Sequence, residues 1–255
     1  MFNKISVFLI VSISIFWLSA EARLINLNSE GFASYLSYYG GSSALATTPF
    51  ENEAVSGYTY SDSLALNYGG EFGFLYNRGR AGFRFTIEVI RPNKLENLLV
   101  KDSNQLTLYS MTSDITGYSP KLGIELGLVS RPTSRWILLF YGGTATVTIK
   151  NDFVLTSDGS AAFSGVSDHS VILRATGTQY GGALTYEFLF NDSTTLFFDM
   201  GYRSMLLSQI VYAQSVTTFS GVKAQGDAVM SSTGLAKTLD FSGYLLNFGF
   251  RIFMY

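Results

Sequence analysis

Large apolar side chains recur at every second position in several stretches of this sequence. Between residues 58 and 76 the even positions include Tyr60, Leu66 and Phe72, whereas the odd positions include Gly69 and Glu71. Only a β-strand places residues i and i+2 on one face and i+1 on the other. The same alternation returns in residues 83–89, 121–128, 178–190, 196–203 and 243–252. The chain is therefore predicted to be all-β, built from two-faced strands.

The connections between these strands alternate in length. Two less regular segments, 32–48 and 135–149, bring the predicted total to eight strands. Short connections fall near 77–80, 130–135 and 191–194, and longer ones near 48–57, 92–115, 150–168 and 208–236. This pattern is typical of an up-and-down antiparallel barrel with turns at one end and loops at the other. Proline has no N–H to donate to a neighbouring strand, and a closed barrel has no edge strand that could accommodate it. Pro120 is therefore expected at the start of the fourth strand.

Composition decides which face of these strands is outside. Only 14% of the residues are charged, against about 25% in an average soluble domain. The small-residue face is a poor surface for water, so we expect it to line the barrel while the bulky face contacts lipid. A Lys or Arg on the lipid face at mid-bilayer costs about 2 to 4 kcal/mol, and none of the six clear strands places one there centrally. The prediction is an eight-stranded antiparallel transmembrane β-barrel.

The first residues have the features of a secretory signal peptide. Lys4 precedes an apolar run over 5–18, and Ala20-Glu21-Ala22 matches a small-x-small cleavage site. The alternative, an uncleaved membrane helix, needs about 20 apolar residues. We therefore expect a signal peptide over 1–22, cleaved after Ala22, followed by one barrel domain over 23–255.

Charge and cysteine content exclude several kinds of function. The formal net charge is −2, so no basic excess exists to attract nucleic acid. The chain has no cysteine, which removes disulfides, thiolate metal sites and a cysteine nucleophile. No cofactor and no metal is expected.

The inward faces carry one polar group of residues that merits attention. Parity along the strands directs five acids and four bases into the barrel: Glu71, Arg84, Glu88, Lys121, Glu125, Glu187, Asp199, Arg203 and Arg251. Charges enclosed in so narrow a space must be paired or hydrated, because an unpaired buried charge costs several kcal/mol. We expect a structural network that fills the barrel; the alternative is a constriction that passes small solutes.

The last strand carries a more specific pattern. It has the polar Asn247, then Gly249 two residues later, then the hydrophobic residues Ile252 and Met254, and it ends with the aromatic Tyr255. This resembles the C-terminal assembly signal of small Gram-negative outer-membrane barrels of the OmpA, OmpX and OmpW type. The resemblance implies location in the outer membrane and contact with its lipid and lipopolysaccharide. It also implies the barrel-assembly machinery as a partner, and no periplasmic domain is expected after Tyr255.

Catalysis depends on the single histidine, His169. Outer-membrane lipid A deacylases and phospholipases resemble such barrels and use a His-x-Ser pair on one face of a strand. Here Ser170 is adjacent to His169, so the two side chains of a strand would face opposite ways. The Asp-x-His arrangement of omptin-type proteases is also absent, and no catalytic residue is predicted.

The expected function is therefore non-enzymatic. Surface loops of such proteins carry recognition, so we expect a role in surface interaction or envelope integrity, with an extracellular ligand held by the loops. The alternative is a narrow porin-like channel or a conduit for small or hydrophobic molecules. A lipid-modifying enzyme is the third and weakest interpretation.

Overall fold

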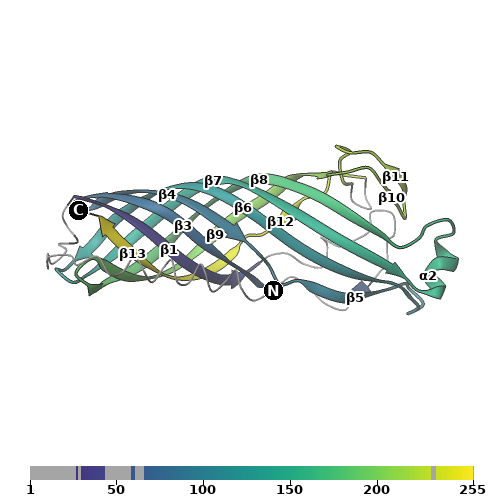
Figure 1. Ribbon diagram of the computed structural model, residues 1–255, viewed down its shortest axis with the longest axis horizontal. Helices are drawn as coiled ribbons and strands as arrows, with labels where there is room; N and C mark the ends of the chain where they lie inside the picture. Colours follow the sequence, from purple (N-terminus) through teal and green to yellow (C-terminus); the bar gives the residue numbers. More distant parts are fainter. Residues whose placement is uncertain (1–26, 28–29, 44–58, 61–65, 231–233, 255) are drawn as a thin grey trace, which may run out of the picture.

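The computed structural model describes residues 27, 30–43, 59–60, 66–230 and 234–254. Eight of the strands in this part of the chain close into an antiparallel ring, with the first strand paired to the last. In ring order they are β1 (Gly31–Ser42), β3 (Leu66–Arg78), β4 (Ala81–Ile90), β6 (Thr107–Ser130), β7 (Ser134–Leu155), β8 (His169–Asn191), β9 (Thr194–Tyr212) and β13 (Gly243–Met254). The predicted fold class is confirmed (Figure 1). Among the described residues, no helix is long and apolar enough to cross a membrane.

Short turns gather at one end of the barrel and loops at the other (Figure 1). At the turn end, Gly79 adopts a φ of 63° between β3 and β4, a left-handed conformation that glycine accepts without strain. The loop end carries the smaller elements: β2 (Thr59–Tyr60), β5 (Leu95–Lys101), α2 (Ser157–Ala162), β10 (Val216–Thr218), β11 (Gly221–Lys223) and β12 (Leu239–Asp240). β5 lengthens the sheet beside β6, and β12 does so beside β9.

Several strands differ from the sequence prediction in length. β6 to β9 run well beyond the predicted 121–128, 135–149, 178–190 and 196–203 toward the loop end. Thr59 and Tyr60, predicted as part of one strand with residues 66–76, instead pair with β5. Part of the predicted first strand, 44–48, lies outside the described residues.

Pro120 does not begin a strand, contrary to the prediction. It lies inside β6, opposite Ile87 of β4, with regular β6–β7 pairing on both sides of it. The neighbouring Ser119 compensates, because its hydroxyl donates a hydrogen bond of 2.5 Å to the carbonyl of Thr144 on β7. The Ser119 hydroxyl therefore satisfies the carbonyl of Thr144 next to Pro120, which has no N–H to donate, and the barrel stays closed.

The two faces of β6 exchange chemical character along its length. Toward the turn end the outward side chains are apolar, as at Leu122 and Ile124, while Glu125 is buried inside. Toward the loop end the outward positions are Thr112 and Asp114, and the buried ones are apolar: Tyr109, Met111 and Ile115. Because the side-chain parity itself does not change, the surroundings of the outer wall must change from lipid to water near Tyr118.

The interior consequently has two compartments. The compartment at the turn end holds the charged residues, and the one at the loop end is an apolar core that includes Val147, Leu173, Leu207 and Phe241. The sequence predicts small and charged residues along the whole interior. This prediction is wrong for the loop-end compartment, which is apolar. It arises because strands that leave the membrane bury apolar side chains as soluble proteins do. A smaller cluster of Leu27, Ala33, Leu75 and Phe253 closes the mouth at the turn end.

Candidate functional site: the barrel interior

Aromatic rings and glycines face each other across the strands of the interior. Each of four inward-facing rings has a glycine as its direct register partner: the buried Tyr35 opposite Gly73, Tyr39 opposite Gly69 and Phe197 opposite Gly249, and the partly buried Tyr141 opposite Gly181. A Cβ at Gly73 would lie 2.5 Å from the Tyr35 hydroxyl oxygen, and one at Gly249 would lie 2.6 Å from the Phe197 ring. The glycines therefore provide the space in which these rings lie across the barrel.

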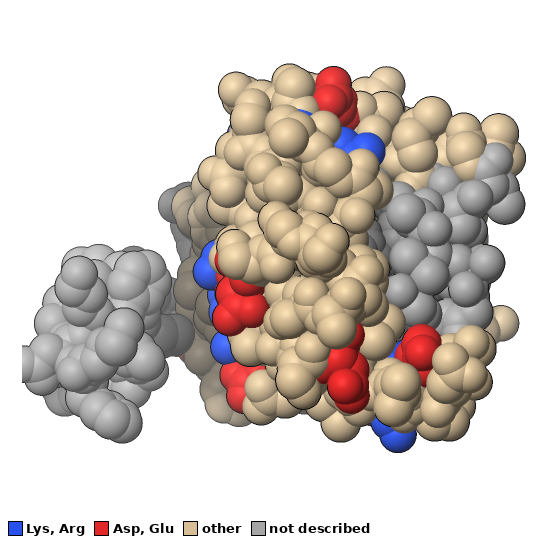
Figure 2. All heavy atoms as spheres, turned by 90° about the vertical axis from the view of Figure 1, so that its right-hand side faces the viewer, with Lys and Arg blue, Asp and Glu red and all other residues tan. Residues whose placement is uncertain are grey.

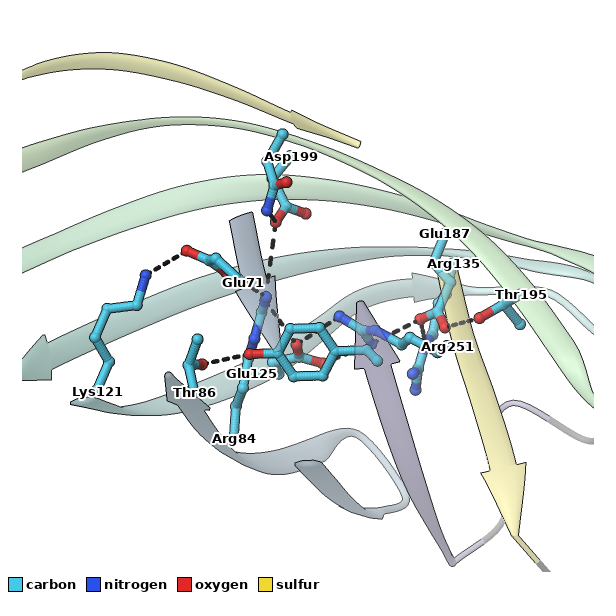
Figure 3. A network of polar contacts seen from close by, with 12 residues as sticks. Glu71, Arg84, Thr86, Lys121, Glu125, Arg135, Glu187, Thr195, Asp199 and Arg251 are labelled. Atoms are coloured by element: carbon cyan, nitrogen blue, oxygen red, sulfur yellow. Dashed lines mark hydrogen bonds and ion pairs between the residues drawn. The ribbon is translucent and has the colours of Figure 1, made fainter. Parts of the chain in front are cut away.

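All nine charged residues predicted to point inward are buried in the compartment at the turn end, each less than 10% exposed. They come from β3, β4, β6, β8, β9 and β13 and meet inside the barrel. Figure 3 shows this group without Glu88 and Arg203. The structure brings them together as one set of alternating charges, which we call the ionic network.

One branch of the network runs toward the loop end. Glu71 is bonded to both Arg84 and Lys121, the Arg84 distance being 3.0 Å. Lys121 Nζ lies 3.1 Å from Glu88, which also accepts a 2.5 Å hydrogen bond from Arg203. Each acid in this branch therefore lies between two cations.

The other branch runs toward the short turns. Arg251 donates to both carboxylate oxygens of Glu125, at 2.6 and 3.0 Å, and to Glu187 at 3.0 Å. Glu187 also accepts from Arg135 Nε at 2.6 Å and from the Thr195 hydroxyl at 2.5 Å. Arg84 joins the two branches, since its Nη1 lies 3.6 Å from Glu125.

Arg135 was missed by the sequence analysis. It is the second residue of β7, where Trp136 to Tyr141 are apolar on both faces and leave the register undetermined. With Arg135 the buried network contains five bases and five acids, against the predicted four and five. Its formal charge is therefore zero, which removes the net cost of enclosing an excess charge.

The aromatic rings also stabilise the cations. The guanidinium carbon of Arg84 lies 4.1 Å from the centre of the Tyr35 ring, and that of Arg251 lies 4.8 Å from Phe197. Lys121 is 4.8 Å from Tyr141. Cation–π contacts of this kind contribute up to about 2 kcal/mol when desolvated, so the rings replace part of the lost hydration.

A small enclosed cavity lies beside the network. Glu71, Arg84, Lys121, Asp199 and Asn247 are among its lining residues, and its volume is about 30 Å³. Asn247 Nδ2 donates to Asp199 Oδ2 at 3.2 Å, while Asp199 Oδ1 and Asn247 Oδ1 have no hydrogen-bond partner among the described residues. The space and the free acceptors fit one or two bound water molecules.

Within the described ranges, no three His, Asp or Glu side chains are grouped so as to hold a metal ion. His169, the first residue of β8, stacks on Phe153 with ring centres 5.0 Å apart. Ser170 instead donates to Asp152 at 2.5 Å, a bond that lowers the pKa of this carboxyl. Histidine and serine therefore have separate partners.

The C-terminal pattern falls on β13. Asn247 and Gly249 face inward, Asn247 to Asp199 and Gly249 beneath Phe197, whereas Met254 is exposed on the outer face and Ile252 is partly exposed. Tyr255 and the predicted signal peptide, residues 1–22, lie outside the described residues.

Comparisons with known proteins agree with the architecture. No family model and no curated protein sequence matches the chain. Among solved structures, a major outer membrane protein from Thermus thermophilus matches with 11% identity and a TM-score of 0.51, covering 87% of this chain and 99% of that one.

Two further solved structures match less closely in shape. OprG from Pseudomonas aeruginosa is 15% identical with a TM-score of 0.46, covering 89% of this chain and 97% of its own. Ail, the attachment invasion locus protein of Yersinia pestis, is 14% identical with a TM-score of 0.43, covering 88% and 99%. The closed ring, the apolar outer wall and the enclosed charges lead to one conclusion: the chain has the fold of a small outer-membrane β-barrel.

Proposed function

We propose that this protein is a closed, non-enzymatic outer-membrane barrel that holds a rigid recognition surface outside the cell. The observation that carries the proposal is the filled interior. The ionic network occupies the compartment at the turn end, and the apolar core occupies the compartment at the loop end. An eight-stranded barrel is only wide enough for its own side chains, so these two layers close the path for solutes.

The part of the barrel that continues past the membrane is the scaffold of the recognition surface. We define the outer extension as residues 107–117, 146–155, 169–177 and 205–212, the loop-end segments of β6 to β9. Its buried side chains include Val147, Ile149 and Leu207, each at most 1% exposed, and each contributes about 1.5 to 3 kcal/mol by burial. This core supports β5, α2 and the β10–β11 hairpin at the far end (Figure 1). Binding residues are most effective when a rigid scaffold positions their loops.

Ion conductance across a planar bilayer tests the closed interior. Purified unmutated protein is expected to give no steady conductance. Arg84→Ala removes the residue that joins Glu71 to Glu125 and is expected to raise it, whereas Arg78→Ala, on an exposed side chain at the turn end, is the matched control and changes nothing. A large constant conductance in the unmutated protein would reject the proposal and favour the alternative, a narrow channel or conduit.

The recognition role needs a separate test. Cells that carry the protein are compared with cells in which β10 and β11 are replaced by a short Gly-Ser linker, with barrel folding checked by gel mobility without heating. Loss of binding to host-cell matrix or to other surface ligands, with the barrel intact, supports recognition. Unchanged binding across all ligands tried contradicts it.

A further inference from the structure

An apolar hollow lies on the outer wall over β4, β6 and β7. Its sides are lipid-facing side chains that include Phe85, Leu122 and Phe140, and Gly142 leaves its floor low. Its volume is about 660 Å³, within the range of about 300 to 1,000 Å³ found for ligand sites. Large exposed side chains surround it, so the hollow is a recess in the surface that acyl chains contact.

A band of charged and hydroxyl side chains lies above the hollow on the same wall. In register on neighbouring strands, Thr116 faces Thr148, and Thr148 faces Arg174; one step further, Asp114 faces Lys150. Arg91, which follows β4, is 3.8 Å from Asp114. Arg91, Lys150 and Arg174 are all exposed and form one outward-facing group of cations.

Acidic residues are mixed into this band. Lys150 lies 3.0 Å from Asp152, and Lys94 lies 2.7 Å from Glu96. No carboxylate among the described residues forms an ion pair with Arg174, so its guanidinium is available. The band as a whole has four bases, Arg91, Lys94, Lys150 and Arg174, against three acids, Glu96, Asp114 and Asp152. Red and blue side chains are also visible on the flank of the loop end in Figure 2.

The spacing of the two features suits one amphiphilic molecule. Thr116 in the band and Leu122 beside the hollow are six residues apart in β6. At about 3.3 Å per residue and a strand tilt of about 40°, they are about 15 Å apart along the barrel axis. Tyr118 lies between them with an exposed ring, and aromatic rings of this kind concentrate at the membrane–water interface. The hollow therefore lies at acyl-chain depth and the cations at headgroup depth.

We propose that this wall binds a phosphate-bearing, multiply acylated lipid of the outer leaflet, of the lipid A class. The acyl chains occupy the hollow over Gly142. Arg91, Lys150 and Arg174 bind the phosphates, and the hydroxyls of Thr116 and Thr148 donate hydrogen bonds to them. A guanidinium pairs well with phosphate because its planar donors match two oxygens. The site is independent of whether the interior conducts.

Titration of delipidated, refolded protein in detergent tests the headgroup half of this site. The probes are bisphosphorylated hexa-acyl lipid A and the same lipid without its phosphates. The triple variant Arg91→Ala, Lys150→Ala, Arg174→Ala is expected to weaken binding of the phosphorylated lipid by about 100-fold, from about 1 kcal/mol for each cation near a lipid surface. The control triple removes three exposed arginines at the turn end, Arg78, Arg80 and Arg131, and is expected to leave affinity unchanged.

Two results would overturn the headgroup assignment. The first is equal affinity of the unmutated protein for the phosphorylated and dephosphorylated lipids. The second is equal loss of affinity in the two triple variants, which would show a general charge effect.

A second pair of variants tests the hollow. A Cβ at Gly142 meets only one atom, 3.8 Å away, and a Cβ at Gly40 meets none within 4 Å, so a side chain can begin at either position without a backbone clash. Gly142→Leu fills the proposed site, whereas Gly40→Leu fills a different hollow, near Trp136 and Leu184. Weaker lipid A binding in Gly142→Leu alone supports the site. Equal binding in both variants contradicts it.

Discussion

Removing the charge of Arg251 tests the physical basis of the ionic network. Its side chain is fully buried and donates three hydrogen bonds to Glu125 and Glu187. After Arg251→Ala, Glu125 keeps only Arg84, at 3.6 Å, while Glu187 keeps Arg135 and Thr195. The network then contains five acids and four bases. Breaking a buried pair by removing one partner costs about 3 to 5 kcal/mol, so we expect a loss of this size in the free energy of unfolding.

The assay is guanidinium unfolding of the protein in lipid vesicles, followed by the fluorescence of Trp136 and by gel mobility. The double variant Arg251→Met, Glu125→Gln restores neutrality and keeps side-chain volume, so it is expected to unfold within about 1 kcal/mol of the unmutated protein. Arg78→Ala, whose side chain is 79% exposed and 4.0 Å from Glu30, is expected to cost less than about 0.5 kcal/mol. A double variant as unstable as Arg251→Ala would refute charge balance as the stabilising factor.

Three further predictions concern the apolar core, the packing over Gly73 and the role of His169. Leu207→Ala should lower the free energy of unfolding by about 2 to 5 kcal/mol, because this side chain is fully buried in the apolar core. The control Leu206→Ala, one residue earlier and 47% exposed, should lower it by less than about 1 kcal/mol. Similar unfolding curves for the two variants would contradict an apolar core in the outer extension. Gly73→Val should lower the free energy of unfolding by about 1 to 3 kcal/mol, because the new side chain overlaps the Phe85 carbonyl and the Tyr35 ring. Gly40→Val, with open space around it, should not lower it. Equal unfolding midpoints would disprove the close packing over Gly73. His169→Ala should leave the mass spectrum of lipid A unchanged in cells that express the protein; a modification that disappears with the substitution would establish an enzyme.

Alternation in the sequence predicted the membrane half of the fold because lipid enforces one chemical type on the outer wall. Beyond Tyr118 the outer wall meets water, so polar residues such as Thr112 and Asp114 take the outward positions and apolar ones turn inward. A prediction that follows apolar outward positions therefore makes the strand too short at its loop end, as it does for β6. Pro120 was misplaced for a different reason: a hydroxyl donor on the preceding residue, Ser119, cannot be recognised without the partner strand.

The inward charges could be predicted residue by residue, because parity alone directs them into the barrel. Their pairing could not, since Glu88 and Arg203 are far apart in sequence and meet only across the closed barrel. Arg135 was missed because the apolar run that follows it gives no parity signal. The rings over glycine depend on cross-strand register, as for Tyr35 and Gly73, and a single sequence does not provide it.

The most direct test of the account is the solvent around the outer wall of β6. The chain has no native cysteine, so single cysteines at Thr112, Leu122 and Ile124 can each carry one spin label in protein reconstituted into vesicles. Labels at Leu122 and Ile124 are predicted to be accessible to oxygen dissolved in lipid and protected from a water-soluble nickel complex, with the opposite result at Thr112. Access of the nickel complex to all three positions would contradict the claim that this strand passes from lipid into water.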